Sequence, residues 1–450
     1  MIKIIVRSKR DADAVKAMLR IFYREWDVKV YTMHGSRTID RALDEIKSII
    51  TQDSFYIVLL GREDTRVALE LDKILPPNVA VRIVPGKRVR NIRVDQLAHE
   101  FTLARSMFRL SVGWDDENKC FRLGLRKGSP LNGFEYNPAY DIFFGLGEHY
   151  MEKLMGILGV KPCKNPLLVR KLDGLHDIYC GPGKYAEIHI FDEGIKPVGR
   201  LTGKAYVEEI SESKLVEANQ ELLKLYERIS LEFLKKYREW ADTVIVPWSG
   251  GKDSTVALWL ALKVFPRGKV KAVYVDTGVE FPQTREYVEE ISRRLGIEVY
   301  TIYAGIDKGL LEENMPMPTH DNRWCTGRKI DALEKKVAEI AEGNTLIVTG
   351  DRDAESSRRS IRPPTRREET EALVVTPIKL WSTAHVQLYM LMEKIPVNPL
   401  YHYGFYRIGC YICPALRSWE LYIMLNTPEI YKRLINNKLY QEFIKQRLKE

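Results

Sequence analysis

Six consecutive residues in the C-terminal half of the chain have the types that a backbone needs in order to hold an anion: Ser249-Gly250-Gly251-Lys252-Asp253-Ser254. The apolar run 244–246 before them predicts a buried strand, and the run 255–265 after them predicts a helix. Glycines allow a tight turn close to a ligand, and a helix N-terminus offers unpaired N–H groups with a partial positive charge. The joint therefore predicts a phosphate site, with an ordinary N-cap at Asp253 or Ser254 as the alternative.

The residue order distinguishes this joint from the most familiar phosphate loop. That loop is G-x-x-x-x-G-K followed by Ser or Thr, whereas here Asp253 follows Lys252. The string SGGKDS instead resembles the pyrophosphate loop of enzymes that cleave ATP between the α and β phosphates and adenylate a substrate. This resemblance implies that the chain binds ATP, with Mg²⁺ as the counter-ion.

The chain around this loop alternates between strand and helix patterns. Predicted strands lie at 270–275, 298–303 and 346–349, and predicted helices at 285–295 and 330–341. Such alternation predicts an α/β domain with a doubly wound parallel sheet, in which ligands bind at the carboxyl ends of the strands.

Polar segments follow two of these strands. DTGVEF begins at Asp276, and GDRDAESSRR begins at Gly350 and includes Arg352 and Arg359. Arginines opposite a pyrophosphate loop neutralise charge as a phosphate bond breaks, so Arg352 and Arg359 are predicted to lie in the active site. An ordinary turn at Asp276 and a surface ion-pair cluster around the arginines are the alternatives.

Three cysteines have spacing that suits a metal centre. Cys325 precedes a predicted helix, and Cys410 and Cys413 form a C-x-x-C. Three thiolates can hold a 4Fe-4S iron–sulfur cluster with one iron left open, or zinc if His402 or another group supplies a fourth ligand; the C-x-x-C alone can form a redox disulfide. The remaining three show no ligand spacing and are predicted to be small buried hydrophobes, not a disulfide scaffold: Cys120, Cys163 and Cys180.

Together these strings resemble the phosphoadenosine-phosphosulfate (PAPS) reductase family of the adenine nucleotide α-hydrolase superfamily. SGGKDS, DTGVEFPQT, RWCT, GDRDAESSRR and PLYHYGFYRIGCYICP occur in the family's order, over about residues 241–425. The resemblance implies catalytic roles for Lys252, Asp253, Arg352 and Arg359. It implies that the nucleotide is bound by Ser249, Gly250, Gly251, Lys252, Asp253, Ser254, Asp276 and Gly350.

Two departures from the family decide which branch is favoured. Sulfonucleotide reductases carry a C-terminal E-C-G-[IL]-H tail, and this chain has no cysteine after Cys413. Cluster-binding reductases have a Cys-Cys pair where Trp324 precedes the single Cys325 here. The chain more closely resembles tRNA-thiolating enzymes, so the leading expectation is an ATP-dependent adenylating sulfurtransferase that acts on RNA and takes sulfur from a donor. A sulfonucleotide reductase with an electron donor, and a nucleotide- or RNA-binding protein with structural zinc and no turnover, are the alternatives.

Composition sets broad limits. The net charge of +9 is compatible with nucleotide or nucleic-acid partners. No apolar run approaches the roughly 20 residues that span a bilayer, and the N-terminus becomes charged too early for a signal peptide, so a cytoplasmic protein without a membrane partner is expected. The abundance of charged residues, 70 Lys+Arg and 61 Asp+Glu, is typical of heat-adapted proteins.

Changes of composition and residue pattern along the chain predict four segments. Residues 1–125 form a small α/β domain, and 130–208 form a β-rich domain whose PVGRL region resembles PUA domains, small β-barrels attached to RNA-modifying enzymes. Residues 212–240 are predicted to be a connecting amphipathic helix, and 241–450 the PAPS-reductase-like domain.

Overall fold

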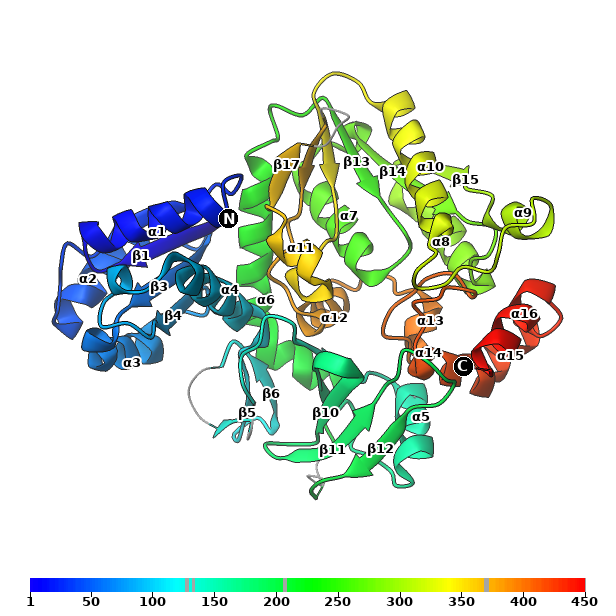
Figure 1. Ribbon diagram of the computed structural model, residues 1–450, viewed down its shortest axis with the longest axis horizontal. Helices are drawn as coiled ribbons and strands as arrows, with labels where there is room; N and C mark the ends of the chain where they lie inside the picture. Colours follow the sequence, from blue (N-terminus) through cyan, green and yellow to red (C-terminus); the bar gives the residue numbers. More distant parts are fainter. Residues whose placement is uncertain (126–128, 132–133, 205–208, 368–371, 450) are drawn as a thin grey trace.

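The computed structural model describes residues 1–125, 129–131, 134–204, 209–367 and 372–449. Residues 132–133 and 205–208 of the expected β-rich domain, and 368–371 and 450 of the expected C-terminal domain, lie outside this description. Four sheets are formed by the described residues, and each occupies its own part of the molecule (Figure 1). No helix in the described ranges is both long and apolar enough to cross a membrane.

The N-terminal sheet is parallel, with strand order β2-β1-β3-β4. All six residues of β3 are buried because helices cover both faces, which is typical of parallel sheets. The elements are β1 Ile2–Val6, α1 Lys9–Phe22, β2 Lys29–Thr32, α2 Ile39–Ile49, β3 Phe55–Leu60, α3 Thr65–Ile74, β4 Val79–Ile83 and α4 Val94–Leu110.

The middle of the chain forms two antiparallel sheets. The smaller contains β5 Val112–Asp115, β6 Cys120–Leu123 and β7 Ser129–Pro130. The larger runs in consecutive order through β8 Asp141–Phe144, β9 Leu167–Arg170, β10 Leu175–Tyr179, β11 Lys184–His189 and β12 Val198–Leu201, with α5 Glu148–Leu158 between β8 and β9. Among the described residues β8 and β12 lie at opposite edges, so the larger sheet is open, whereas the PUA resemblance predicts a barrel.

A long helix, α6 Glu212–Lys235, joins the middle sheets to the C-terminal domain. The Ser211 hydroxyl caps it by accepting from the Lys214 N–H. Its apolar face packs on β6, α7 and α12, so α6 lies between the N-terminal unit and the C-terminal sheet (Figure 1). Tyr226 on this face donates to the Phe108 carbonyl at 2.6 Å and stacks on His385, which ties three parts of the chain together.

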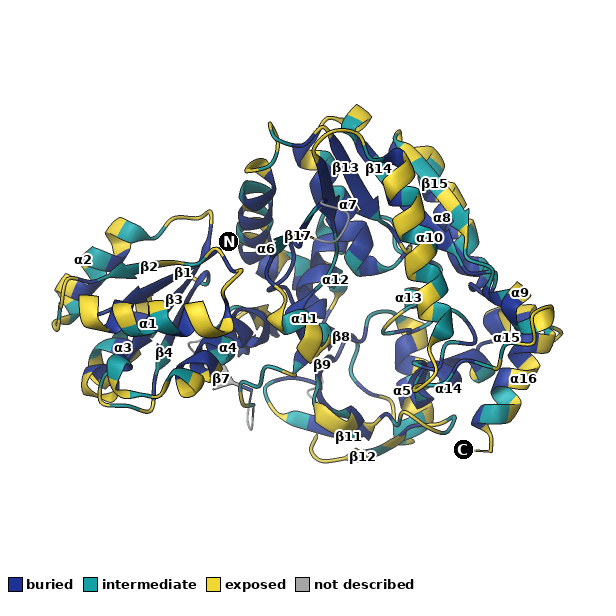
Figure 2. Cartoon of the chain, turned by 45° about the horizontal axis from the view of Figure 1, so that its top comes forward, coloured by how far each residue is buried: buried dark blue, intermediate teal, exposed yellow. Residues whose placement is uncertain are grey.

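The C-terminal domain is built on a six-stranded sheet of order β15-β14-β13-β16-β18-β17, parallel except for β17. This confirms the predicted doubly wound α/β fold. Its strands are β13 Thr243–Pro247, β14 Val270–Asp276, β15 Glu298–Tyr303, β16 Thr345–Val348, β17 Thr365–Arg367 and β18 Leu373–Val375. Figure 2 shows that β13 and β14 are buried while α10 has an exposed outer face.

The helices of this domain cover the two faces of the sheet and extend it at the C-terminal end. They are α7 Lys252–Val264, α8 Pro282–Leu295, α9 Ile306–Leu311, α10 Trp324–Ile340, α11 Ser357–Ile361, α12 Thr383–Met392, α13 Pro399–His402, α14 Ser418–Asn426, α15 Pro428–Leu434 and α16 Lys438–Arg447. From β13 the chain first adds β14 and β15 on one side of β13, and it later crosses over to add β16 on the other side. The gap between β13 and β16 is therefore the switch point, where open α/β sheets bind ligands.

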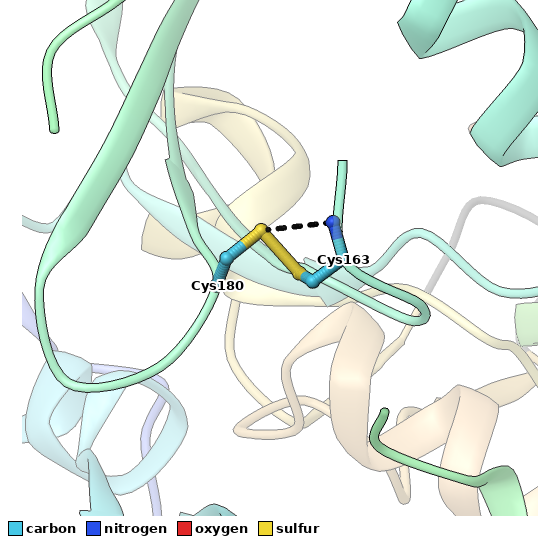
Figure 3. The surroundings of a disulfide bond; sticks show 2 residues. All are labelled: Cys163 and Cys180. Atoms are coloured by element: carbon cyan, nitrogen blue, oxygen red, sulfur yellow. Dashed lines mark hydrogen bonds between the residues drawn. A yellow bond between two sulfur atoms is a disulfide. The ribbon is translucent and has the colours of Figure 1, made fainter. Parts of the chain in front are cut away.

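One prediction about the cysteines is wrong. Cys163 and Cys180 form a disulfide, with their Cα atoms 5.6 Å apart, and the Cys163 N–H donates to the Cys180 sulfur at 3.4 Å (Figure 3). Sequence spacing did not reveal the pair because the loop after α5 returns beside the end of β10 only in the folded chain. Cys120 is fully buried, as predicted.

Chemical counting of thiols tests this disulfide. Protein denatured without reductant should expose four thiols, and reduction should raise the number to six. The Cys163→Ser/Cys180→Ser double variant should lose about 3 kcal/mol of stability, seen as a lower thermal midpoint, because a 17-residue link no longer restricts the unfolded chain. Cys120→Ala, as a control, should lower both counts by one. Six thiols without reduction would contradict the assignment.

Candidate active site

The loop SGGKDS turns sharply between β13 and α7. Gly250 has φ of +70°, a conformation that glycine adopts at little cost, and an added Cβ there would lie 3.1 Å from the Val288 side chain. Gly251 is the N-cap of α7, whose 13 residues are long enough to give its first turn an appreciable dipole. The turn therefore presents helix N–H groups at the switch point of the sheet.

Side chains around the loop hold its shape without a ligand. The Ser249 N–H donates to the Ser254 hydroxyl at 3.2 Å, and this hydroxyl donates to the Gly251 carbonyl at 3.1 Å. From α13, the Tyr401 hydroxyl accepts from the Lys252 N–H at 3.0 Å. A loop that is already ordered loses less entropy when an anion binds.

Gly350 allows β16 to approach the loop closely. A Cβ on this residue would lie 2.5 Å from the carbonyl carbon and oxygen of Asp253 and 2.7 Å from the Ser254 nitrogen. Real side chains do not make such contacts, so Gly350 sets the spacing between the loop and the GDRDAESSRR segment. Gly350 therefore lines the cavity and is also required to be glycine by its close packing against the loop.

A cavity of about 600 Å³ opens above the loop, within the range of small-molecule sites. The loop and the segment after β16 form its floor, and residues from α13, the following turn and the middle sheet form its walls. The cavity lining includes Arg170, Ser249, Gly251, Lys252, Asp253, Ser254, Arg323, Gly350, Asp351, Arg352, Glu355, Arg359, Tyr401, Tyr406 and Arg407. Five of the six predicted loop residues, both predicted arginines and Gly350 therefore line one cavity. The remaining loop residue, Gly250, forms the turn beneath them.

Lys252 lies almost entirely inside the protein, with 6% of its surface exposed. Its ammonium is 3.0 Å from Asp253 Oδ2, donates to the Tyr406 carbonyl at 3.2 Å, and lies over the rings of Tyr401 and Tyr406. Burial alone would lower the pKa of Lys252, but the charge of Asp253 outweighs it and the pKa is raised. Lys252 is therefore a permanent positive charge at the cavity floor.

Arg352 has a different environment from the one that its sequence position predicts. Its guanidinium donates to Asp253 Oδ1 at 2.7 Å, to Asp141 Oδ2 of the middle sheet at 3.0 Å and to the Thr383 hydroxyl at 2.9 Å, with 2% of its surface exposed. Burial would raise the pKa of both carboxyls, but the charge of Arg352 lowers both. In this arrangement the guanidinium of Arg352 orients Asp253, and Arg352 itself also lines the cavity.

Arg359 lies on α11 and faces the same cavity. Its guanidinium pairs with Glu355 at 2.5 Å and with Asp351 at 3.3 Å, and it is partly exposed. Asp351 is also within 4.0 Å of the guanidinium groups of Arg362 and Arg366. An exposed ion pair exchanges partners at little cost, so Arg359 is free to contact a phosphate.

Asp276, at the end of β14, is not brought to this cavity. It accepts from the Gly278 N–H at 2.8 Å and pairs with Arg285 at 2.9 Å. A second hollow, of about 150 Å³, lies between the ends of β13 and β14 and α10, and among the described residues Asp276 lines neither hollow. These contacts fit the alternative interpretation from the sequence, in which Asp276 belongs to an ordinary turn.

The three candidate metal ligands lie in one region, beside the segment that follows β14. The Cys410 sulfur is 3.2 Å from the Thr277 hydroxyl and donates to Glu280 at 3.6 Å, and the Cys413 N–H donates to the Cys410 carbonyl at 3.0 Å. Burial, followed by the proximity of Cys413, raises the pKa of Cys325. Cys325 follows the cavity-wall residue Arg323 by two positions, and Cys410 follows Arg407 by three.

A basic group lies beside these thiols. Lys329 on α10 is 3.6 Å from Glu280, and although burial would lower its pKa, the charges of Glu280 and of Cys410 raise it. Three thiols near an ammonium have the chemistry of a thiolate metal site. However, no three His, Cys, Asp or Glu side chains in the described ranges are gathered closely enough to hold a metal ion. His402, the alternative zinc ligand, lines a different cavity of about 90 Å³.

Several residues of the site were missed by sequence analysis. Tyr401, Tyr406 and Arg407 lie within the string PLYHYGFYRIGCYICP, so their closeness to the cysteines was a usable signal. Asp141 and Arg170 gave no signal, because each belongs to a strand more than 100 residues before the segment it contacts.

Comparison with known proteins finds a family match for the part of the chain that carries the loop. Residues 243–416 match the family model described as phosphoadenosine phosphosulfate reductase domain. An uncharacterized protein of Methanocaldococcus jannaschii is 35% identical over 53% of this chain and 50% of its own length. An adenosine 5'-phosphosulfate reductase of Deinococcus radiodurans is 32% identical over 38% of this chain and 66% of its own length.

A third relative is subunit 2 of a sulfate adenylyltransferase from a Marinomonas species. It is 28% identical over 42% of this chain and 69% of its own length. The chain spans about half the length of the first two curated relatives that it matches.

Substitution of Gly350 tests the packing of the loop. Gly350→Ala should force β16 and the loop apart, cost about 1–3 kcal/mol of stability, and weaken binding of ATP measured by calorimetry. Gly268→Ala is the matched control, because nothing lies within 4 Å of its added Cβ. Equal nucleotide affinity in Gly350→Ala and the wild type would show that this contact does not shape the loop.

The buried Asp141–Arg352 pair should make stability depend on acid pH. Because the pKa of Asp141 is lower in the folded than in the unfolded protein, its contribution is present above the unfolded value of about 4 and is lost as the pH falls below it. The thermal midpoint should therefore fall less steeply below about pH 4 in Asp141→Asn than in the wild type. Asp44→Asn, at an exposed site on α2, should keep the wild-type slope. Parallel curves for all three proteins would refute the linkage.

Proposed function

Because residues 243–416 belong to the phosphoadenosine phosphosulfate reductase domain family, we propose that this protein binds ATP, adenylates a base oxygen of RNA and replaces that oxygen with sulfur. The observation that carries the proposal is a complete SGGKDS loop on the floor of a 600 Å³ cavity, with three thiols beside its wall. The loop suits a departing pyrophosphate, and the thiols suit the delivery of sulfur.

The floor of the cavity supplies what a triphosphate needs. The first turn of α7 offers N–H groups, Ser249 and Ser254 offer hydroxyls, and Lys252 offers a buried positive charge. The cavity carboxylates of Asp253, Asp351 and Glu355 all have ion-pair partners. Mg²⁺ would therefore be held mainly by oxygens of the nucleotide.

The reaction divides into two substitutions. In the first, the base oxygen attacks the α-phosphorus, the α–β phosphoanhydride bond breaks, and pyrophosphate leaves with its charge stabilised by Lys252 and the helix N-terminus. In the second, a sulfide sulfur attacks the carbon that bears the adenylated oxygen, the C–O bond breaks, and AMP leaves with both bonding electrons. Sulfur stays at the sulfide level, so neither step consumes an oxidant or a reductant.

Cys325, Cys410 and Cys413 are the proposed ligands of a 4Fe-4S cluster, with zinc as the alternative. When bound, such a cluster supplies an open iron that carries sulfide. Burial raises the pKa of both Cys325 and Cys410, and the charge of Glu280 raises that of Cys410 further, so metal binding would have to displace their protons. Lys329 and the Thr277 hydroxyl, 3.2 Å from the Cys410 sulfur, act in the opposite direction at Cys410. RNA as the partner is supported by the net charge of +9 and by the exposed Arg323 and Arg407 at the cavity wall.

A sulfonucleotide reductase is the second candidate. It is favoured by the 32% identity between part of this chain and a protein named adenosine 5'-phosphosulfate reductase. Such an enzyme would take sulfite from the nucleotide with electrons from a thiol donor and would release no pyrophosphate. The same cavity would then hold a phosphosulfate in place of a triphosphate.

Pyrophosphate release from ATP in the presence of bulk tRNA, on protein purified without oxygen, tests the proposal. The wild type should release pyrophosphate and, with sulfide present, form thiolated RNA. Lys252→Ala should lower both rates by about 10²-fold, because it removes the charge under the leaving group. Cys410→Ala should still release pyrophosphate but lose protein-bound iron and form no thiolated RNA.

Lys438→Ala, whose side chain is 76% exposed on α16, is the control and should match the wild type. Sulfite from adenosine 5'-phosphosulfate and a thiol, without pyrophosphate from ATP, would establish the reductase instead. One zinc per chain and neither product would refute both enzymes and support the binding protein with structural zinc.

A further inference from the structure

The middle sheet places an acid and a base side by side against the C-terminal domain. Asp141 begins β8 and Arg170 ends β9, and the two residues are direct partners across this antiparallel pair. Both lie far outside residues 243–416, the part of the chain that matches the family. Asp141 is completely buried, whereas Arg170 is partly buried and lines the nucleotide cavity.

Asp141 locks this part of the sheet in place. Its Oδ2 atom accepts from Arg352 at 3.0 Å, from the Thr383 hydroxyl at 2.8 Å and from the Tyr406 hydroxyl at 3.1 Å, and its Oδ1 atom accepts from the Thr383 N–H at 3.1 Å. Two further bonds, between the Gln387 amide and the backbone of Phe144, join the other end of β8 to α12. A strand held at both ends positions its neighbour, so the place of Arg170 is well determined.

Arg170 extends from this fixed strand to the cavity wall. Its guanidinium donates to the Ala354 carbonyl and lies 5.9 Å from the centre of the Tyr406 ring. Among the described residues no carboxylate forms an ion pair with it. The charge of Asp141 acts on Arg170 without forming an ion pair with it, while backbone and ring contacts hold the side chain. This arrangement leaves the guanidinium able to bind an anion.

The charges at the cavity floor explain why such a group is needed. The positive charges of Lys252 and Arg352 are balanced by the negative charges of Asp253 and Asp141, all four being linked by ion pairs. Arg359 is likewise paired with Asp351 and Glu355. A bound oxyanion therefore gains attraction from Arg359 only when its exposed ion pairs open, and from the lining arginines that have no ion-pair partner among the described residues: Arg170, Arg323 and Arg407.

We propose that the middle sheet is part of the nucleotide site, and that Arg170 binds a phosphate oxyanion of the nucleotide in the cavity. The inference rests on the proposed function only in taking ATP as the nucleotide. Arginine suits this task because its planar guanidinium forms two parallel hydrogen bonds with a phosphate. Its partly buried position strengthens the attraction relative to that of an exposed arginine.

Calorimetric titration with MgATP tests the assignment in three variants. Arg170→Gln should weaken ATP binding about tenfold and make the affinity less sensitive to salt, because one charge contact with phosphate is lost. Arg170→Lys keeps the charge without the paired hydrogen bonds and should have intermediate affinity. Arg200→Gln is the matched control: it removes an arginine from β12 of the same sheet, 77% exposed and paired with Glu187, and should bind ATP as the wild type does.

Each outcome supports or overturns the inference. Wild-type affinity in Arg170→Gln would overturn it, and so would an equal loss in Arg200→Gln, which would point to a general effect of charge. Comparison of Arg170→Lys with Arg170→Gln guards against loss of the fold, since both remove the guanidinium contacts to Ala354 and Tyr406. If the wild type binds no ATP, the proposed function fails, and the same series titrated with adenosine 5'-phosphosulfate decides the role of Arg170; a wild type that binds neither nucleotide would overturn the inference as well.

Discussion

The guanidinium of Arg352 joins the two parts of this protein on which its site depends. It lies buried between Asp253 in the phosphate loop and Asp141 in the middle sheet. A charge of this kind is tolerated inside a protein only when it is paired and fully hydrogen-bonded, and removal of one partner leaves the others buried and uncompensated. The loop, the middle sheet and the segment after β16 are thus mutually dependent, although they are widely separated in sequence.

The same segment is also held from the N-terminal side. Asp353, next to Arg352, pairs with Arg105 of α4 at 2.9 Å and with Lys379 at 2.6 Å. Further along, the indole N–H of Trp26 donates to the Ile361 carbonyl at 3.2 Å. Residues 352–361, which include the cavity-lining Arg359, are therefore fixed by both regions that precede residues 243–416. The N-terminal unit and the middle sheet therefore contribute to the geometry of the site.

The site also separates two kinds of chemistry in space. The floor of the cavity is a network of paired charges around a helix N-terminus, suited to phosphate. The thiols lie beside the wall, where Lys329 and Glu280 form a second, smaller network with Cys410. Because Arg323 and Arg407 belong to the wall and lie close in sequence to the cysteines, a ligand that fills the cavity would contact the segments that carry the thiols. This arrangement is compatible with a reaction in which phosphate leaves on one side and sulfur arrives on the other.

Sequence alone determined the parts of this protein that depend on neighbouring residues. The β-branched run before SGGKDS, the glycine pair and the helix that follows are local signals, and the alternation of strands and helices predicted the doubly wound sheet. The cysteine spacing singled out Cys325, Cys410 and Cys413, which lie in one region of the fold, although no three ligands in the described ranges gather closely enough to hold a metal ion. Tertiary structure alone decided the rest: the disulfide Cys163–Cys180, the two carboxylates on Arg352 and the arrival of Arg170 at the cavity. Asp141 and Arg352 are 211 positions apart, and such a contact depends on how separately formed sheets pack, which no local pattern of residue types records.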